Sequence, residues 1–163
     1  MGNTLKPSIV LASATSSGII NHWHMSTQRV MGEDTKHRDR GNALNVIDYT
    51  NDGKKLCVAG LDRNVYVYDD MDNRLFATIH SRGLRVNGHV NRIFSIRCHP
   101  DDSNVLASAG WDGSIKIYDI RAKNPVASIA GPYVSGDSID MYDDMIVTGS
   151  SRNKNCMQMF SLS

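Results

Sequence analysis

Three polar residues between positions 89 and 112 are of the types that make up a hydrolase triad. His89 could serve as a general base, Ser108 as a nucleophile, and Asp112 as the group that orients the imidazole. Such a triad works only where the serine faces a cleft that admits a substrate. Whether these residues can catalyse therefore depends on whether the strands and loops that carry them place Ser108 at a cleft.

Other catalytic or metal-binding patterns are weak in this sequence. His22 and His24 are two residues apart, so on a strand they would share a face, as two metal ligands must. No third ligand is apparent, and we expect surface histidines on either side of Trp23. Gly-rich phosphate loops, the HExxH zinc motif and paired catalytic carboxylates are absent from the sequence. We therefore predict a protein that is not an enzyme, with no cofactor and no metal site.

Composition limits the class of protein further. The 163 residues are 40% hydrophobic, enough for one domain with a core, and the net charge of +1 provides no general attraction to nucleic acid or membrane. The apolar stretch at residues 9–14 is too short to span a bilayer and lacks the charged flank of a secretory signal. Cys57, Cys98 and Cys156 form no CxxC pair and fall in expected strands, which predicts reduced core thiols. We expect a cytoplasmic or nuclear protein that is not secreted and does not enter a membrane.

A complete β-hairpin signal lies at residues 106–119, LASAGWDGSIKIYD. Asp112 and Gly113 tolerate positive φ, so the chain can reverse in a two-residue turn. After the turn, Ile115 and Ile117 alternate with other residues at the period of a strand. The residues before the turn are small and mostly apolar, which is typical of a strand covered on both faces.

Imperfect copies of this hairpin begin at Leu11, Leu56 and Ile146. An aromatic residue closes each copy at intervals of about 45 residues: Trp23, Tyr68, Tyr118 and Phe160. Periods of this size with several strand-like segments predict a radial array of sheets, and no long run with helical period is present. Residues 32–42 are polar and charged, and we expect them to form a long exposed loop.

The third copy resembles a WD40 repeat, because Gly88-His89 precedes HPDDSNVLASAGWDGSIKIYD at residues 99–119. The match is strong at 88–119, fair at 43–69, and weaker at 9–24 and 139–161. The resemblance implies an all-β fold, a β-propeller with four-stranded antiparallel blades around a central channel. Residues 1–163 are expected to form one partial propeller of three to four blades: 8–31 in part, 42–79, 89–130, and 137–163 without its last strand.

The order of the copies also implies missing blades. The first copy lacks its first strand, and the chain stops after the third strand of the last copy. On this resemblance we expect the C-terminal half of a longer propeller. Blades with bare faces and open edges are then expected to self-associate.

The resemblance further implies a structural quartet of a His, a strand Ser or Thr, a turn Asp and a Trp. In the third copy these positions are His89, Ser108, Asp112 and Tyr118. A phenol does not place its donor where an indole N–H would lie, so we expect a three-member network with Tyr118 mainly packing. The second copy has Val58 at the Ser position and no Gly-His pair. We therefore expect His89, Ser108 and Asp112 to hold the blade together and not to catalyse.

The turns and entry loops of a propeller share one rim, where a rigid scaffold presents variable residues. Trp111 directly precedes the Asp112 turn, and it is either a partner-binding hot spot or a residue packed on the neighbouring blade's loop. Leu61 is its counterpart in the second copy. Arginines near these turns would form a local basic rim: Arg63, Arg82, Arg85, Arg92 and Arg152.

These residues support two functions. The first is a non-catalytic scaffold that docks protein or peptide partners on its rim. The alternative is a propeller whose rim arginines bind RNA or a phosphorylated segment by bidentate contacts. Phosphate binding should weaken steeply with salt, so salt dependence distinguishes the two.

Overall fold

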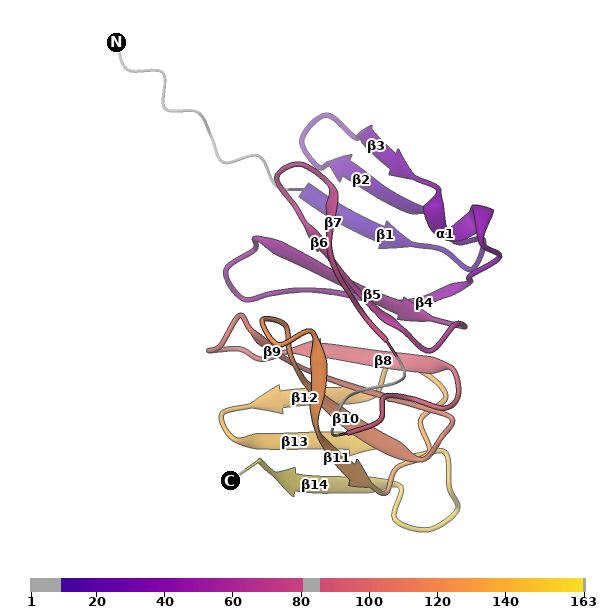
Figure 1. Cartoon of the computed structure of the whole chain (residues 1–163), viewed down its shortest axis with the longest axis vertical. Helices are drawn as coiled ribbons and strands as arrows, with labels where there is room; N and C mark the ends of the chain where they lie inside the picture. The colour runs from indigo at the N-terminus through magenta and orange to yellow at the C-terminus, as the bar shows by residue number, and fades with distance from the viewer. Residues whose placement is uncertain (1–9, 81–85, 163) are drawn as a thin grey trace.

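The computed structural model describes residues 10–80 and 86–162, and within them the chain is built from antiparallel β-sheets (Figure 1). Four sheets of three or four strands are stacked along the long axis of the molecule, each with its strands in sequence order. The all-β, partial-propeller fold predicted from the sequence is thus confirmed. No helix in the described ranges is long and apolar enough to cross a membrane.

Each sheet is called a blade here and numbered along the chain. Blade 1 contains β1 (Val10–Ala14), β2 (Ile20–His24) and β3 (Arg29–Asp34), and the short helix α1 (Lys36–Asp39) follows it. Blade 2 contains β4 (Leu44–Tyr49), β5 (Lys55–Gly60), β6 (Val65–Asp69) and β7 (Arg74–Ile79). Blade 3 contains β8 (Ile93–Cys98), β9 (Val105–Gly110), β10 (Ser114–Asp119) and β11 (Asn124–Ala130). Blade 4 contains β12 (Ile139–Tyr142), β13 (Met145–Gly149) and β14 (Met157–Ser161).

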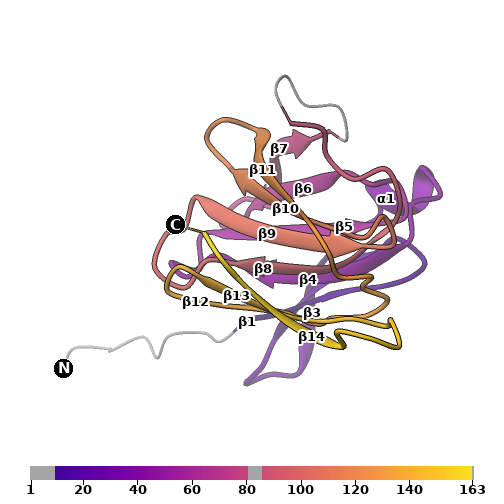
Figure 2. The ribbon, with the colours of Figure 1, turned by 90° about the horizontal axis from the view of Figure 1, so that it is seen from below.

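Neighbouring blades bury their apolar faces against each other. Strands β4, β8 and β12 lie side by side along the stack. Seen from below, β7 and β11 lie on the opposite side of the stack from β4 and β8, so they form the outer wall (Figure 2). The middle strands β5 and β9 are almost wholly buried, as their small apolar residues predict. Burial between blades is the main source of stability in such an array.

A polar chain also joins the inner strands of blades 2 to 4. The Asp48 carboxylate accepts a hydrogen bond from the Cys98 backbone N–H at 2.8 Å, across the blade boundary. Arg97 lies between two carboxylates, 3.9 Å from Asp48 and 3.3 Å from Asp140. Burial raises the pKa of Asp48, although the Cys98 N–H and Arg97 oppose that shift. The blades are therefore joined by specific polar contacts as well as by apolar packing.

Residues 32–42 do not form the exposed loop expected from their charge. Strand β3 continues to Asp34, and α1 follows directly. His37 in α1 and Asn42 after it are buried, at 1% and 3% exposure. The prediction was wrong because two groups of blade 2, the Tyr68 hydroxyl and the Asp62 backbone N–H, bind these two side chains.

Two other sequence expectations need correction. Cys156 is exposed and precedes β14, because the long turn of blade 4 delays the strand by a residue, whereas Cys57 and Cys98 are buried free thiols as expected. His22 is not a surface histidine, since it is only 8% exposed and faces Asp70 of blade 2. The second blade covers this face of β2, which the local sequence does not reveal.

Candidate functional site

The structure brings His89, Ser108 and Asp112 together inside blade 3. His89 lies in the loop before β8, with Nε2 2.8 Å from the Ser108 Oγ and Nδ1 2.7 Å from an Asp112 carboxylate oxygen. The same oxygen accepts the Val90 backbone N–H at 3.0 Å. The hydroxyls of Ser108 and Tyr118 are 3.4 Å apart, so Tyr118 adds one long contact to its packing. The network links the entry loop, the second strand and the turn of one blade.

The Asp112 carboxylate is ionised at neutral pH. Burial by itself would raise its pKa, but the hydrogen bond and charge of His89, together with the N–H of Val90 and the bonds from Ser114, outweigh that effect. The pKa falls from 3.8 to about 2. The carboxylate therefore stabilises the folded blade at every pH at which it remains charged.

The connectivity from serine to imidazole to carboxylate is that of a hydrolase triad, but its surroundings differ. Both Ser108 and His89 are 0% exposed. A nucleophile has to reach a substrate carbonyl, and Ser108 is covered by the blade itself. Burial of this kind supports the structural role that the sequence led us to expect.

Blade 2 contains a related network that sequence reasoning missed. His37 Nε2 lies 2.7 Å from the Tyr68 hydroxyl on β6, and its Nδ1 lies 3.2 Å from the Asn42 amide nitrogen. The Asn42 side-chain oxygen accepts the backbone N–H of Asp62 in the β5–β6 turn at 3.1 Å. Burial lowers the pKa of His37, which favours the neutral imidazole.

Blade 2 thus links the His37 imidazole to its β5–β6 turn without a serine, unlike the network of blade 3. Valine stands at position 58, where blade 3 has Ser108, so the Tyr68 phenol contacts the imidazole directly. The signal that could have revealed this is Tyr68 itself, since a buried phenol needs a polar partner. The histidine was hidden because it comes from a charged segment without a preceding glycine.

On the rim of blade 3, Trp111 lies in a cluster with one arginine and two aromatic residues. The Arg92 guanidinium lies over the indole at 5.4 Å from the ring centroid, and Tyr133 is stacked on the indole with centroids 6.4 Å apart. Phe94 contacts the same ring at 4.9 Å between centroids. Trp111 is half-buried, so it packs on the loop of blade 4 and also contributes to the surface. The two interpretations of this residue are therefore compatible.

Main-chain bonds hold the rim in place. Trp111 donates its backbone N–H to the Arg92 carbonyl at 3.1 Å, and Val134 donates to the Gly110 carbonyl at 3.3 Å. A Cβ at Gly110 would lie 2.0 Å from the Arg92 carbonyl oxygen, so only glycine permits this approach. In blade 4, Ser151 donates to the Tyr133 carbonyl at 2.8 Å. The aromatic cluster is thus prepositioned by the backbone of two blades.

Of the five predicted arginines, two lie beside Trp111, one lies in another turn, and two fall outside the described residues. Arg92 and Arg152 flank the Trp111 turn, since a Cβ at Gly113 would lie 3.2 Å from the Arg152 guanidinium. Both arginines are exposed, and neither forms an ion pair within the described part of the chain. Leu61, at 36% exposure, and Arg63 occupy the β5–β6 turn of blade 2 and do not join the cluster around Trp111. The remaining two, Arg82 and Arg85, lie outside the described residues.

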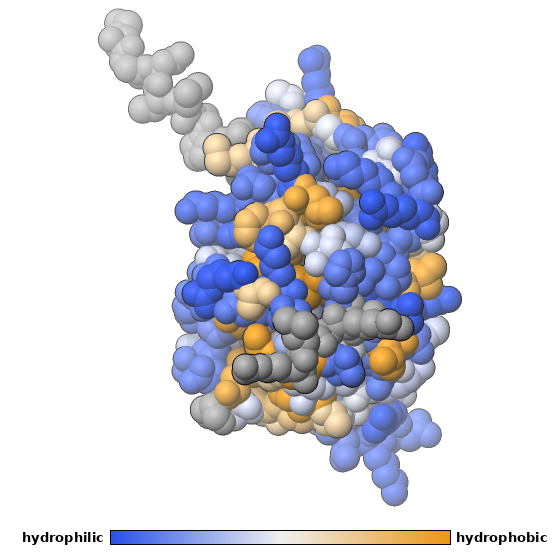
Figure 3. Space-filling view, viewed as in Figure 1, coloured by the Kyte–Doolittle hydropathy of each residue, from blue (hydrophilic) through white to orange (hydrophobic). Residues whose placement is uncertain are grey.

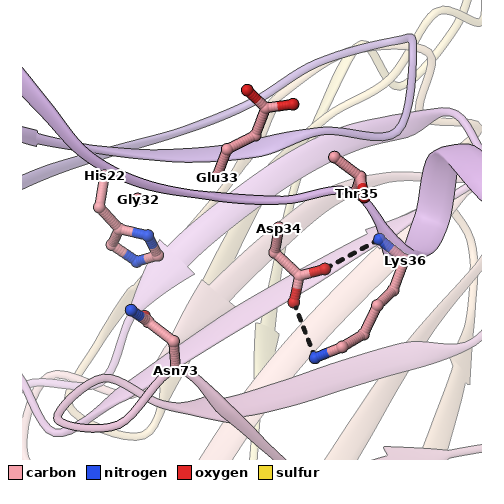
Figure 4. Close-up of a pocket in the computed structure, with 7 residues that line it drawn as sticks. All are labelled: His22, Gly32, Glu33, Asp34, Thr35, Lys36 and Asn73. Atoms are coloured by element: carbon pink, nitrogen blue, oxygen red, sulfur yellow. Dashed lines mark hydrogen bonds and ion pairs between the residues drawn. The ribbon is translucent and has the colours of Figure 1, made fainter.

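A separate hollow of about 320 Å³ lies between blades 1 and 2 (Figure 4). Polar and charged residues line it, among them His22 from β2, Glu33 and Asp34 from β3, and Asn73 from the β6–β7 turn. Lys36 forms an ion pair with Asp34 at 3.1 Å, and the His22 Nε2 has no hydrogen-bond partner among the described residues. No group of three His, Cys, Asp or Glu suited to a metal ion occurs among the described residues.

Comparison with known proteins is consistent with this architecture. Residues 81–119 match the family described as "WD domain, G-beta repeat". The chain is 25% identical to a ribosome biogenesis protein WDR12 homolog of Oryza sativa subsp. japonica over 147 residues, covering 89% of this chain and 32% of the relative.

Two further relatives show the same pattern of partial coverage. The chain is 28% identical over 117 residues to the ribosome biogenesis protein YTM1 of Pyricularia oryzae, covering 71% of this chain and 22% of the relative. It is 32% identical over 71 residues to coronin-7 of Rattus norvegicus, covering 44% of this chain and 8% of the relative. The chain therefore spans about a third or less of the length of these curated relatives.

Proposed function

Because this chain is a WD40-repeat protein built from propeller blades, we propose that it is a non-catalytic scaffold that docks a protein or peptide partner on the blade 3 rim. The observation that carries the proposal is the Trp111 cluster, in which Arg92 and Tyr133 contact the ring of a half-buried indole and restrict its orientation. A side chain that is already ordered loses little conformational entropy when a partner binds. Tryptophan and arginine are also the residue types most enriched at interface hot spots.

The test is Trp111→Ala in the epitope-tagged protein, with partners recovered from cells and quantified by mass spectrometry. Removing a central hot-spot side chain should cost about 2 kcal/mol or more, a loss of more than tenfold in affinity. Tyr142→Ala is the matched control, because Tyr142 is an 82% exposed aromatic residue at the end of β12. The same partners recovered equally by wild type and Trp111→Ala, at equal folded fraction, would contradict the proposal.

The second candidate function is binding of RNA or a phosphorylated segment. Its support is that Arg92 and Arg152 are exposed beside Trp111 and that neither forms an ion pair within the described residues. Guanidinium groups free of carboxylates can bind phosphate oxygens in a bidentate manner. Binding of a labelled RNA or phosphopeptide should then fall steeply between low and moderate salt. An affinity that is insensitive to salt would exclude this function and leave the protein-docking scaffold.

The names of two relatives suggest a cellular setting. Since the WDR12 homolog and YTM1 are ribosome biogenesis proteins, we extend the proposal to a nuclear role in ribosome assembly. Coronin-7, whose name does not mention ribosomes, is also similar to part of this chain, so similarity to these relatives alone does not select this setting. Fluorescence microscopy of the tagged protein tests it. Exclusion from the nucleus would overturn this extension without affecting the rim.

A further inference from the structure

The last strands of blades 1, 2 and 3, which are β3, β7 and β11, share one feature. Each outer strand has a β-bulge against its neighbour, and the register leaves one residue without a partner: Met31, Phe76 and Val126. These three side chains are 59%, 44% and 52% exposed, respectively. An apolar residue thus emerges at the same place on the outer strand of blades 1, 2 and 3.

The bulge of blade 2 differs from the others because lysines surround it. The ammonium groups of Lys123 and Lys55 lie 5.2 Å and 5.7 Å from the centroid of the Phe76 ring. Lys123 comes from the β10–β11 turn of blade 3 and Lys55 from β5, so the cluster bridges two blades. Leu75, 39% exposed, extends its apolar surface. Hydrophobic residues emerge among hydrophilic ones in front of β7 (Figure 3).

The two lysines of this cluster differ from other lysines of the chain in their pairing. Neither forms an ion pair within the described part of the chain, whereas Lys36 and Lys54 are each paired with an aspartate. A cation over an aromatic face gains about 0.5 to 1 kcal/mol at an exposed site, and it can still bind a carboxylate. The surface therefore combines an apolar centre with two free positive charges.

We infer that this surface, formed by Leu75, Phe76, Lys55 and Lys123, docks an acidic peptide segment that carries a large apolar side chain. The apolar side chain would cover Phe76 and Leu75, and flanking carboxylates would bind the two ammonium groups. The interaction relies on side chains, because a β-bulge twists an outer strand and disfavours addition of another strand. The surface lies on the outer wall, separate from the rim around Trp111, and goes beyond the function proposed for that rim.

Selection from a phage-displayed library of random short peptides, using the whole chain as target, tests the inference. Peptides that depend on this surface should contain Asp or Glu beside Leu, Phe or Trp. Their affinity, measured by fluorescence polarisation, should fall about tenfold or more with Phe76→Ala, a loss typical of a small hot spot. The double charge reversal Lys55→Glu/Lys123→Glu leaves Phe76 in place and should abolish binding.

Two controls separate this surface from the rim and from misfolding. Trp111→Ala should leave the affinity of the selected peptides unchanged, and so should Val126→Ala, which truncates the equivalent bulge residue on blade 3. Circular dichroism checks that each variant folds. Selection of no peptide, of basic peptides, or of peptides whose affinity is unchanged in both Phe76→Ala and the lysine double variant would overturn the inference. Equal recovery of partners by wild type and Trp111→Ala in the rim experiment would overturn only the proposed scaffold function.

Discussion

Replacing Asp112 with asparagine tests whether the buried network of blade 3 stabilises the fold. The side chain keeps its shape, and its remaining oxygen can accept a bond from His89 or from Val90, but the negative charge is lost. The folded-state pKa of about 2, against an ordinary value of 3.8, measures how strongly the fold favours the charged form. At about 1.4 kcal/mol for each pKa unit, the charge contributes roughly 2 to 3 kcal/mol.

The pH dependence gives this prediction a definite sign. The pKa of Asp112 is lowered on folding, so its contribution is fully present above 3.8 and is lost as the pH falls through about 2. Wild type and Asp112→Asn should therefore differ in free energy of unfolding by about 2 to 3 kcal/mol at pH 7. The difference should shrink as the pH approaches 2.

Urea denaturation followed by circular dichroism, repeated across this pH range, measures the difference. Asp144→Asn is the matched control, because Asp144 is exposed and its side chain forms no hydrogen bond or ion pair within the described residues. Surface substitutions of this kind usually change stability by no more than about 0.5 kcal/mol. Equal stability of Asp112→Asn and wild type at pH 7, or a difference that does not change with pH, would refute the reasoning.

Three other outcomes are expected. Tyr68→Phe should destabilise the fold by about 1 to 3 kcal/mol in urea denaturation, because it leaves the buried His37 Nε2 without its hydrogen-bond partner. An unchanged midpoint would show that blade 2 does not need this contact. A maleimide reagent should label Cys156 in the native protein and the two buried cysteines only after unfolding, as mass spectrometry can verify. Blades 1 and 4 expose the apolar side chains of Leu11, Met157 and Met159, so the chain alone should self-associate at micromolar concentration. Light scattering that detects only a sharp monomer would contradict this.

The sequence by itself was sufficient for the type of fold and for the third blade. The turn at Asp112-Gly113 and the alternation after it depend on neighbouring residues only, so the β10 hairpin could be recognised directly. The repetition of that hairpin then indicated a stack of sheets. These signals depend on residues that are neighbours in the chain, so a single sequence is enough to recognise them.

The tertiary structure decided what depends on contacts between blades. His37 and Asn42 are buried because Tyr68 and the Asp62 turn, far along the chain, bind their polar atoms. No local pattern distinguishes such a segment from a solvated loop. His22 was misjudged for the same reason, since blade 2 covers it.

The candidate sites follow the same division. The sequence singled out Trp111 and the arginines near it, but only the fold placed Arg92 over the indole. The cluster around Phe76 was not predicted, because a β-bulge exposes it and a turn of the next blade supplies Lys123. Bulge position and blade spacing arise from packing the sheets together, so a site built across two blades is determined by the tertiary structure.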